Sequence, residues 1–317
     1  MVKVSIIIPF LNEEENIPLL TESLNSFFSS IKSFEAEIIF VNDGSTDNSI
    51  SILKQQNHNS YSSKLISFSK NFGSHAALRA GITYSTGDYI TFIYADLQDP
   101  LSLITEMFDK IHQQDHCDIV WATRKSTESG LLESTFSNIY ASLMKKYVSV
   151  LYPSKGFDIV MFSKKVSTIL NQNIENNSSI FLQILTLGFK QDFVVYDKKP
   201  RIKGKSKWTF SKKMKLFIDS FVAFSYAPIR FVSFLGIIFF VFGLVWTVYI
   251  ITRKLIYDDL VSGWPAITSI LLLGFGITNI GLGIIAEYLW RTLDVSRKRP
   301  VFIVNEVNEL NSKNVVS

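Results

Sequence analysis

The feature that most constrains the fold is an alternation of short apolar runs with longer helix-like stretches in the first half of the chain. Five runs rich in Ile, Val and Phe are predicted as strands: Val4–Ile8, Glu37–Val41, Leu65–Phe68, Tyr89–Tyr94 and Ile119–Ala122. This alternation is typical of a mostly parallel sheet covered by helices. Ligands of such sheets bind outside the carboxyl ends of the strands. The polar residues that follow each strand are therefore the candidate site residues.

The first two strands are each followed by a polar turn. The first leads into Pro9-Phe10-Leu11-Asn12-Glu13 and the second into Asn42-Asp43-Gly44-Ser45-Thr46-Asp47. Asp47 is placed to cap the next helix. The sequence contains neither a G-x-G-x-x-G segment after the first strand nor a G-x-x-x-x-G-K-[ST] segment. A nucleotide would therefore be held without the glycine cradle of dinucleotide-binding or P-loop sites.

The fourth strand leads into Tyr94-Ala95-Asp96-Leu97-Gln98-Asp99-Pro100. Side chains two apart on an extended chain point to the same side, which places Asp96 and Gln98 together. Their oxygens are suitable ligands for a hard divalent cation that also binds a diphosphate. We therefore predict a Mg²⁺ or Mn²⁺ site at this turn. For Asp99, which precedes Pro100, we predict a helix cap instead.

Charge and cysteine content limit the kinds of metal site and binding partner that the chain can have. Cys117 is the only cysteine, which excludes a disulfide framework or a cysteine-based metal site within one chain. The net charge of +4 conceals a basic run without an acid, formed by Lys198, Lys199, Arg201, Lys203, Lys205, Lys207, Lys212, Lys213 and Lys215. Such a run can bind nucleic acid or be a solvated loop. Next to a long apolar segment it favours lipid head groups or phosphates, so we expect no nucleic-acid partner.

Two uncharged runs, 231–251 and 264–286, are each long enough to cross a bilayer. We therefore predict a transmembrane hairpin over 230–290, with spans near 231–251 and 265–287. Basic residues flank both ends, which predicts a cytoplasmic domain at 1–210 and a cytoplasmic tail at 291–317. Residues 211–229 have a helical apolar pattern, read as an amphipathic interfacial helix or as a core helix. Glycines in the second run make association into a homo-oligomer plausible.

Several segments together resemble the family 2 glycosyltransferases, which have a GT-A fold. They are Ser5-Ile6-Ile7-Ile8-Pro9 with Asn12-Glu13, Val41 to Asp47, Asn71-Phe72-Gly73, and Ala95-Asp96-Leu97-Gln98. The segments Gly204-Lys205-Ser206-Lys207-Trp208 and Ala286 to Arg291, with Arg299-Pro300, are similar to the polyprenyl-phosphate glycosyltransferases of that family. Dolichol-phosphate mannose synthases and bactoprenol glucosyltransferases are members of this group.

The resemblance implies an inverting, metal-dependent transfer of a hexose from a nucleotide diphosphate sugar to undecaprenyl or another polyprenyl phosphate. It favours UDP-glucose over UDP-N-acetylglucosamine and GDP-mannose. It also implies an integral protein of the bacterial inner membrane with its catalytic domain in the cytoplasm. The implied donor-site residues are Pro9, Leu11, Glu13, Asp43, Asp96, Lys198, Arg201, Lys205 and Ser206, with Asp96 and Gln98 on the metal and Arg124 and Asp158 as catalytic residues.

The chain departs from the family pattern at three places. Tyr94 stands where an acidic residue is frequent, Gly156-Phe157-Asp158 replaces Gly-Asp-Phe, and Lys198 replaces an arginine. A lysine offers a point charge where arginine offers a two-pronged donor. Two alternatives stay open: a processive polysaccharide synthase, which one hairpin and the missing Gln-x-x-Arg-Trp segment disfavour, and a catalytically silent nucleotide-binding scaffold.

Overall fold

A computed structural model of the chain describes residues 1–113, 117–125, 140–153, 157–173, 179–198, 263–296 and 300–310, with separate positions between 231 and 256. The chain divides into two compact units. One unit comprises Met1–Phe217 together with Pro300–Ser317, and the other comprises Ile218–Arg299. The chain thus leaves the first unit once and returns to it near its carboxyl end.

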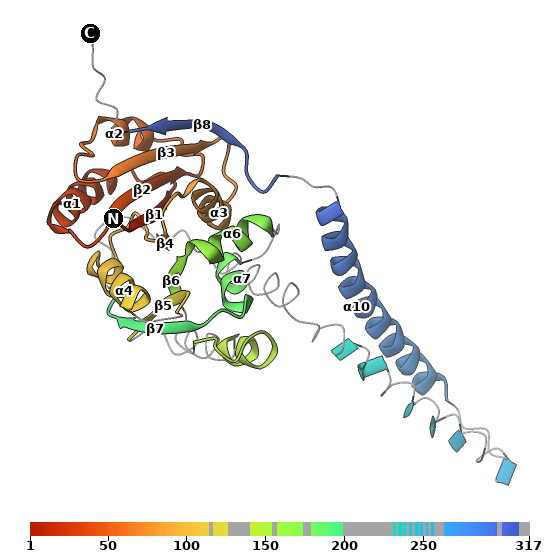
Figure 1. The fold of residues 1–317 in the computed structure, drawn as a ribbon. Coiled ribbons are helices and arrows are strands. Elements are labelled where there is room, and N and C mark those ends of the chain that lie inside the picture. Colours follow the sequence, from red (N-terminus) through yellow and green to blue (C-terminus); the bar gives the residue numbers. More distant parts are fainter. Residues whose placement is uncertain are drawn as a thin grey trace. The chain divides into compact units, whose positions relative to one another are not determined.

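Eight described strands form one sheet in the order β7-β5-β6-β4-β1-β2-β3-β8, with β7 and β8 at its edges (Figure 1). Their bounds are β1 Lys3–Phe10, β2 Glu35–Asn42, β3 Ser62–Phe68, β4 Tyr89–Phe92, β5 Ile119–Arg124, β6 Phe157–Ser163, β7 Gln191–Tyr196 and β8 Val304–Glu309. β1 pairs in parallel with β2 and β4, β2 with β3, and β5 with β7. β6 is antiparallel to β4 and β5, and β8 is antiparallel to β3. The predicted α/β fold with a mostly parallel sheet is confirmed.

Helices cover both faces of this sheet. Their bounds in the first unit are α1 Ile17–Ser30, α2 Ser49–Gln55, α3 Ser74–Tyr84, α4 Ser102–Gln113, α6 Lys164–Gln172 and α7 Ile180–Thr186. In Figure 1, α1 and α4 lie on one side of the sheet, and α3, α6 and α7 lie on the other. Because both faces are covered, β1 and β2 are buried at nearly every position and read as continuous apolar runs.

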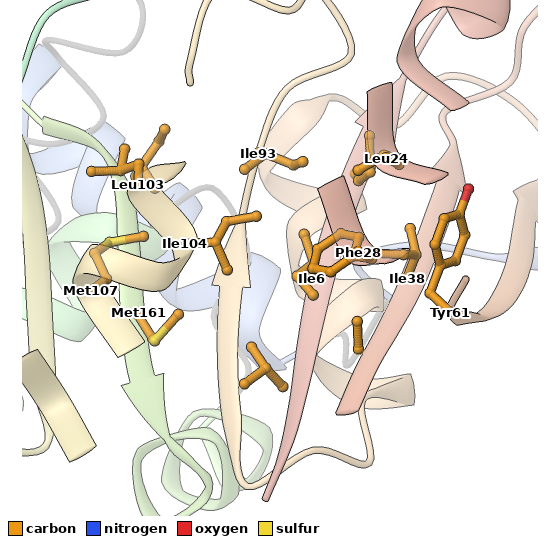
Figure 2. Close-up of a cluster of buried hydrophobic side chains, with 14 of the residues drawn as sticks. Ile6, Leu24, Phe28, Ile38, Tyr61, Ile93, Leu103, Ile104, Met107 and Met161 are labelled. Atoms are coloured by element: carbon orange, nitrogen blue, oxygen red, sulfur yellow. The ribbon is translucent and has the colours of Figure 1, made fainter. Parts of the chain in front are cut away.

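The larger core lies between the sheet and helices α1 and α4. Figure 2 shows Ile6 and Ile38 from the two central strands beside Leu24 and Phe28 of α1. Leu103, Ile104 and Met107 of α4 extend the same cluster toward β6. Burying one such side chain contributes roughly 1.5–3 kcal/mol. This core fixes the central strands whose ends carry the candidate site.

All five strands expected from the sequence are present, but three further strands were not predicted. β6 and β7 each contain a short apolar run, Ile159 to Phe162 and Phe193 to Tyr196, but none of the five expected strands falls there. β8 lies in the expected carboxyl-terminal tail, where four of its six residues are exposed and the strand offers no apolar run. A strand of this kind is recognisable only by its partner, which is β3.

The predicted localisation as an integral membrane protein is wrong. In the described parts of the chain, no helix combines the length and the apolar character that crossing a membrane requires. A span needs about 20 consecutive apolar residues in one helix, whereas an apolar stretch of sequence shows composition alone. Between 231 and 256 only separate positions are described, and the expected second span falls in helix α10, Trp264–Ser296. The inferred bacterial inner membrane and cytoplasmic orientation are withdrawn with it.

Other expectations about the carboxyl-terminal half are not tested. The amphipathic helix at 211–229 lies outside the described residues. Association into a homo-oligomer stays a prediction.

Candidate active site

The predicted site residues gather at one edge of the sheet. Because β1 to β5 and β7 run in the same direction, their carboxyl ends meet at this edge, and antiparallel β6 begins there. Pro9 lies near the end of β1, and Leu11 and Glu13 follow it. Asp43 follows β2, Arg124 ends β5, and Lys198 follows β7 by two residues. The topology therefore brings together residues that are widely separated in the sequence.

The turns after β1 and β2 hold each other in place. The Asn12 side chain accepts a hydrogen bond from the Thr46 amide at 2.8 Å, and the Asn12 amide donates to the Ser45 hydroxyl at 2.9 Å. Asn12 adopts a left-handed backbone with φ of 51°, which asparagine tolerates well. The Glu13 amide donates to the Ser49 hydroxyl at 2.8 Å. The candidate donor residues Leu11 and Glu13 thus lie in a loop that is fixed to the Asp43 loop.

Asp43 is buried, with an exposed fraction of 4%, and its carboxylate is bound by backbone amides. The amides of Phe72 and Gly73 donate to it at 2.7 and 3.0 Å. Burial raises the pKa of the Asp43 carboxyl, and these two hydrogen bonds offset part of that effect. Gly44 follows with φ of 74°, and a Cβ there would lie 2.5 Å from the backbone carbon of Lys70. The loop after β3 therefore packs directly on Asp43 and Gly44.

The turn after β4 carries the predicted metal ligands. The Gln98 amide donates to the Asp96 carboxylate at 3.3 Å, which closes a tight turn. Leu97 within it has φ of 55°, a left-handed conformation that costs a residue with a side chain roughly 1–2 kcal/mol. Its persistence indicates that surrounding contacts hold the turn.

The donor set at this turn fits a divalent cation. The described residues contain no group of three or more His, Cys, Asp or Glu side chains that would hold a metal alone. Asp96 and Gln98 supply two oxygens, and a diphosphate supplies more, which is how Mg²⁺ is commonly bound. Oδ2 of the adjacent Asp99 is buried and has no hydrogen-bond partner among the residues that the structure describes. The turn therefore suits a cation shared with a diphosphate better than a closed protein site.

Asp99 is a site residue that the sequence reading missed. Its exposed fraction is 6%, and its Oδ1 accepts a hydrogen bond from the Tyr196 hydroxyl at 2.9 Å. The Lys198 ammonium lies 3.6 Å from the same oxygen. The predicted helix cap is wrong, because α4 begins only at Ser102 and the carboxylate is engaged with the end of β7. An acid three residues after Asp96 was the available signal.

Arg124 belongs to the same network. It pairs with Tyr196 in the β5–β7 register. Burial raises the pKa of the Tyr196 hydroxyl, Asp99 raises it further, and the positive charge of Arg124 lowers it in part. Burial lowers the pKa of Lys198, which the Asp99 carboxylate counteracts. Lys198 thus faces the buried Asp99 carboxylate, and Arg124 lies beside Tyr196, which donates a hydrogen bond to the same carboxylate.

The remaining predicted residues are only partly described. Asp158 is the second residue of β6, at a shift in the β5–β6 register between Phe157 and Ile159. This places its backbone at the site edge. Arg201, Lys205 and Ser206 lie outside the described residues.

Comparison with known proteins gives the family. Residues 5–170 match the family described as glycosyl transferase family 2. A prophage bactoprenol glucosyl transferase homolog of Escherichia coli K12 is 33% identical over 97% of this chain and 100% of its own length. The bactoprenol glucosyl transferase of Shigella phage SfV is 32% identical over 95% of this chain and 98% of its own.

Among solved structures, the chain is similar to glucosyl-3-phosphoglycerate synthase of Mycobacterium tuberculosis in complex with Mn²⁺, UDP and phosphoglyceric acid. That protein is 16% identical, with a TM-score of 0.49 over 70% of this chain and 76% of that chain. The family match covers more than half of the chain, and the sequence relatives extend over nearly all of it. The chain therefore belongs to glycosyl transferase family 2.

Proposed function

We propose that this chain transfers glucose, with inversion, from UDP-glucose to the phosphate of undecaprenyl or another polyprenyl phosphate. The observation that carries the proposal is the similarity, over nearly the whole chain, to proteins named bactoprenol glucosyl transferases. The grouping of acidic and basic residues at the carboxyl edge of the sheet supports it, because a departing diphosphate needs both cations and metal ligands.

The donor nucleoside is assigned to the loops after β1 and β2, which are hydrogen-bonded to each other. Pro9, Leu11 and Glu13 would contact the base and ribose, together with the Asp43 carboxylate. Asp43 is suited to hydrogen bonds with a ribose, because amides of the β3 loop already fix its orientation. A hydrogen-bonding side chain whose orientation is already fixed loses little conformational freedom when the ligand binds.

The diphosphate is assigned to the turn after β4 and to the cations around Asp99. Asp96 and Gln98 would hold Mg²⁺ or Mn²⁺, which when bound neutralises charge on the diphosphate oxygens. Arg124 and Lys198 would contact phosphate oxygens, with Arg201, Lys205 and Ser206 completing the set. The buried Asp99 carboxylate would orient Lys198, and Tyr196 would orient Arg124, its neighbour in the β5–β7 register.

In the transfer itself, an oxygen of the acceptor phosphate forms a bond to the anomeric carbon while the bond from that carbon to UDP breaks. A phosphate monoester with a second pKa of about 6 is largely ionised at neutral pH and needs little help in losing a proton. We therefore assign Asp158 the task of orienting the acceptor more than that of a base.

The test uses purified full-length protein with Mg²⁺, polyprenyl phosphate and separately labelled UDP-glucose, UDP-N-acetylglucosamine and GDP-mannose. We expect organic-extractable label from UDP-glucose. Label from another donor would reassign the sugar, and a long water-soluble polymer would indicate a processive synthase. If no donor gives product or is hydrolysed, the transferase proposal fails and a silent nucleotide-binding scaffold is favoured.

A further inference from the structure

The segment that follows α10 in sequence packs on the loop that binds Asp43. The Phe302 ring stacks on Phe68, the last residue of β3, with ring centroids 5.3 Å apart and planes at 12°. The Ser69 amide donates to the Ile303 carbonyl at 3.1 Å. The register of β3 and β8 shifts between Ser67 and Phe68, which redirects the strand at this point. Phe302 therefore contacts β3 where the chain leaves the sheet.

From Phe68 the contact continues to Asp43. The Phe68 ring meets the Phe72 ring edge to face, with centroids 5.7 Å apart and planes at 88°. The Phe72 amide is the donor that lies 2.7 Å from the Asp43 carboxylate. Two ring contacts and one hydrogen bond thus connect Phe302 to a predicted donor-binding residue.

In the described parts of the chain, the loop between Phe68 and Phe72 is exposed on its outer side. Ser69, Lys70 and Asn71 are exposed, and the Lys70 ammonium lies over the Phe72 ring at 5.2 Å. On its inner side the loop backbone is packed against Gly44. Removal of the outer aromatic contact would therefore let the Phe72 and Gly73 amides move away from Asp43.

We propose that Phe302 is a positioning residue for donor binding, acting through Phe68 and Phe72 on the Asp43 carboxylate. This inference rests on the proposed function, in which Asp43 contacts the donor nucleoside. It gives the returning carboxyl-terminal segment a role beyond covering the edge of β3.

The test measures binding of UDP with Mg²⁺ to the full-length protein by calorimetry. Loss of one aromatic pair predicts that Phe302→Ala raises Kd by about threefold to tenfold. Phe302→Tyr keeps the ring and is expected to bind as the wild type does. Phe302→Leu keeps apolar volume without a ring and is expected to fall between them, and it replaces the alanine variant if that variant does not fold.

Two control variants separate positioning from general destabilisation. Phe27→Ala removes an aromatic pair with Phe28 in the last turn of α1, and Glu306→Gln removes the β8 ion pair with Lys54. Both should leave Kd for UDP unchanged. Equal weakening by either control, or unchanged binding by folded Phe302→Ala and Phe302→Leu, would overturn the proposal.

A second readout does not depend on the donor. Hydrogen exchange of the peptide containing residues 69–73, measured without nucleotide, should accelerate in Phe302→Ala and not in Phe27→Ala. If the wild type binds no UDP, the assigned donor is wrong, and this exchange result still decides whether Phe302 holds the loop. Unchanged exchange in Phe302→Ala would refute the positioning role by itself.

Discussion

Replacing Glu37 by glutamine should destabilise the sheet unit at neutral pH without touching the candidate site. Glu37 lies near the amino end of β2, at the edge of the sheet opposite the site, and its exposed fraction is 2%. Its carboxylate accepts hydrogen bonds from the Ser5 hydroxyl and from the amide and hydroxyl of Thr86. The ammonium groups of Lys3 and Lys64 lie 3.2 and 3.3 Å away.

These contacts fix the size of the effect. Burial alone would raise the pKa of Glu37, but the hydrogen bonds from Ser5 and Thr86, with the Lys3 charge, lower it from 4.5 to about 2. A difference of this size between folded and unfolded states corresponds to about 3 kcal/mol of folding free energy. Because the folded pKa is the lower one, this stability is present above pH 4.5 and is lost as the pH falls toward 2.

The stability difference between the wild type and Glu37→Gln should depend on pH, and this dependence is what the assay tests. For the wild type, linkage predicts a loss of about 1 kcal/mol by pH 4 and about 2 kcal/mol by pH 3 from this group. Glu37→Gln cannot titrate, so it should be about 3 kcal/mol less stable at pH 7 and approach the wild type as the pH falls. Glutamine also carries an amide NH₂, which is itself a donor and cannot accept the hydrogen bonds that the carboxylate accepts.

The measurement is urea unfolding at pH 3, 4, 5 and 7, with hydrogen exchange of β1 and β2 peptides as the local readout. Urea is preferred because guanidinium salt screens the charges under study. Glu35→Gln, an exposed residue in the same strand, is the matched control and should change little. Equal stability of Glu37→Gln and wild type at pH 7, or a difference that does not shrink by pH 3, would refute the reasoning.

Three further predictions concern the candidate site. Gly44→Ala combines a φ of 74° with a Cβ 2.5 Å from the Lys70 backbone, so it should weaken UDP binding by about tenfold or more. In Gly73→Ala the new Cβ would have nothing within 4 Å, so only backbone strain is added. In the same titration, Gly73→Ala should therefore bind UDP more tightly than Gly44→Ala does. Asp99→Asn removes the carboxylate charge that faces the Lys198 ammonium, so kcat/KM for UDP-glucose should fall by about 10- to 100-fold. Circular dichroism should show that the variant is folded. Unchanged kcat/KM would contradict a positioning role for Asp99. Asp158→Asn should lower kcat by only a few fold with polyprenyl phosphate in steady-state assays, because the acceptor is already ionised, and a loss of about 1,000-fold would instead identify an essential base.

The central strands were predictable because burial on both faces imposes a continuous apolar run. Val4–Ile8 and Glu37–Val41 fall within β1 and β2, which lie side by side in the middle of the sheet. β8 lies at one edge of the sheet and is mostly exposed, so no such run marks it. β7, at the other edge, contains only a short apolar run, Phe193 to Tyr196. The apolar stretches near 231–251 and 264–286 misled the assignment of localisation for a different reason. A hydropathy pattern reports what a segment contains and not the helix that it forms.

The fold class and the strand ends from which binding residues would project follow from patterns within a few residues, so the sequence alone is enough to predict them. The tertiary structure alone decided which of those residues act together. Asp99 meets Tyr196, and Phe302 meets Phe68, because parallel pairing and the return of the chain bring distant segments to one edge. Strand order and register are set by packing of the whole sheet, and no local period in the sequence encodes them.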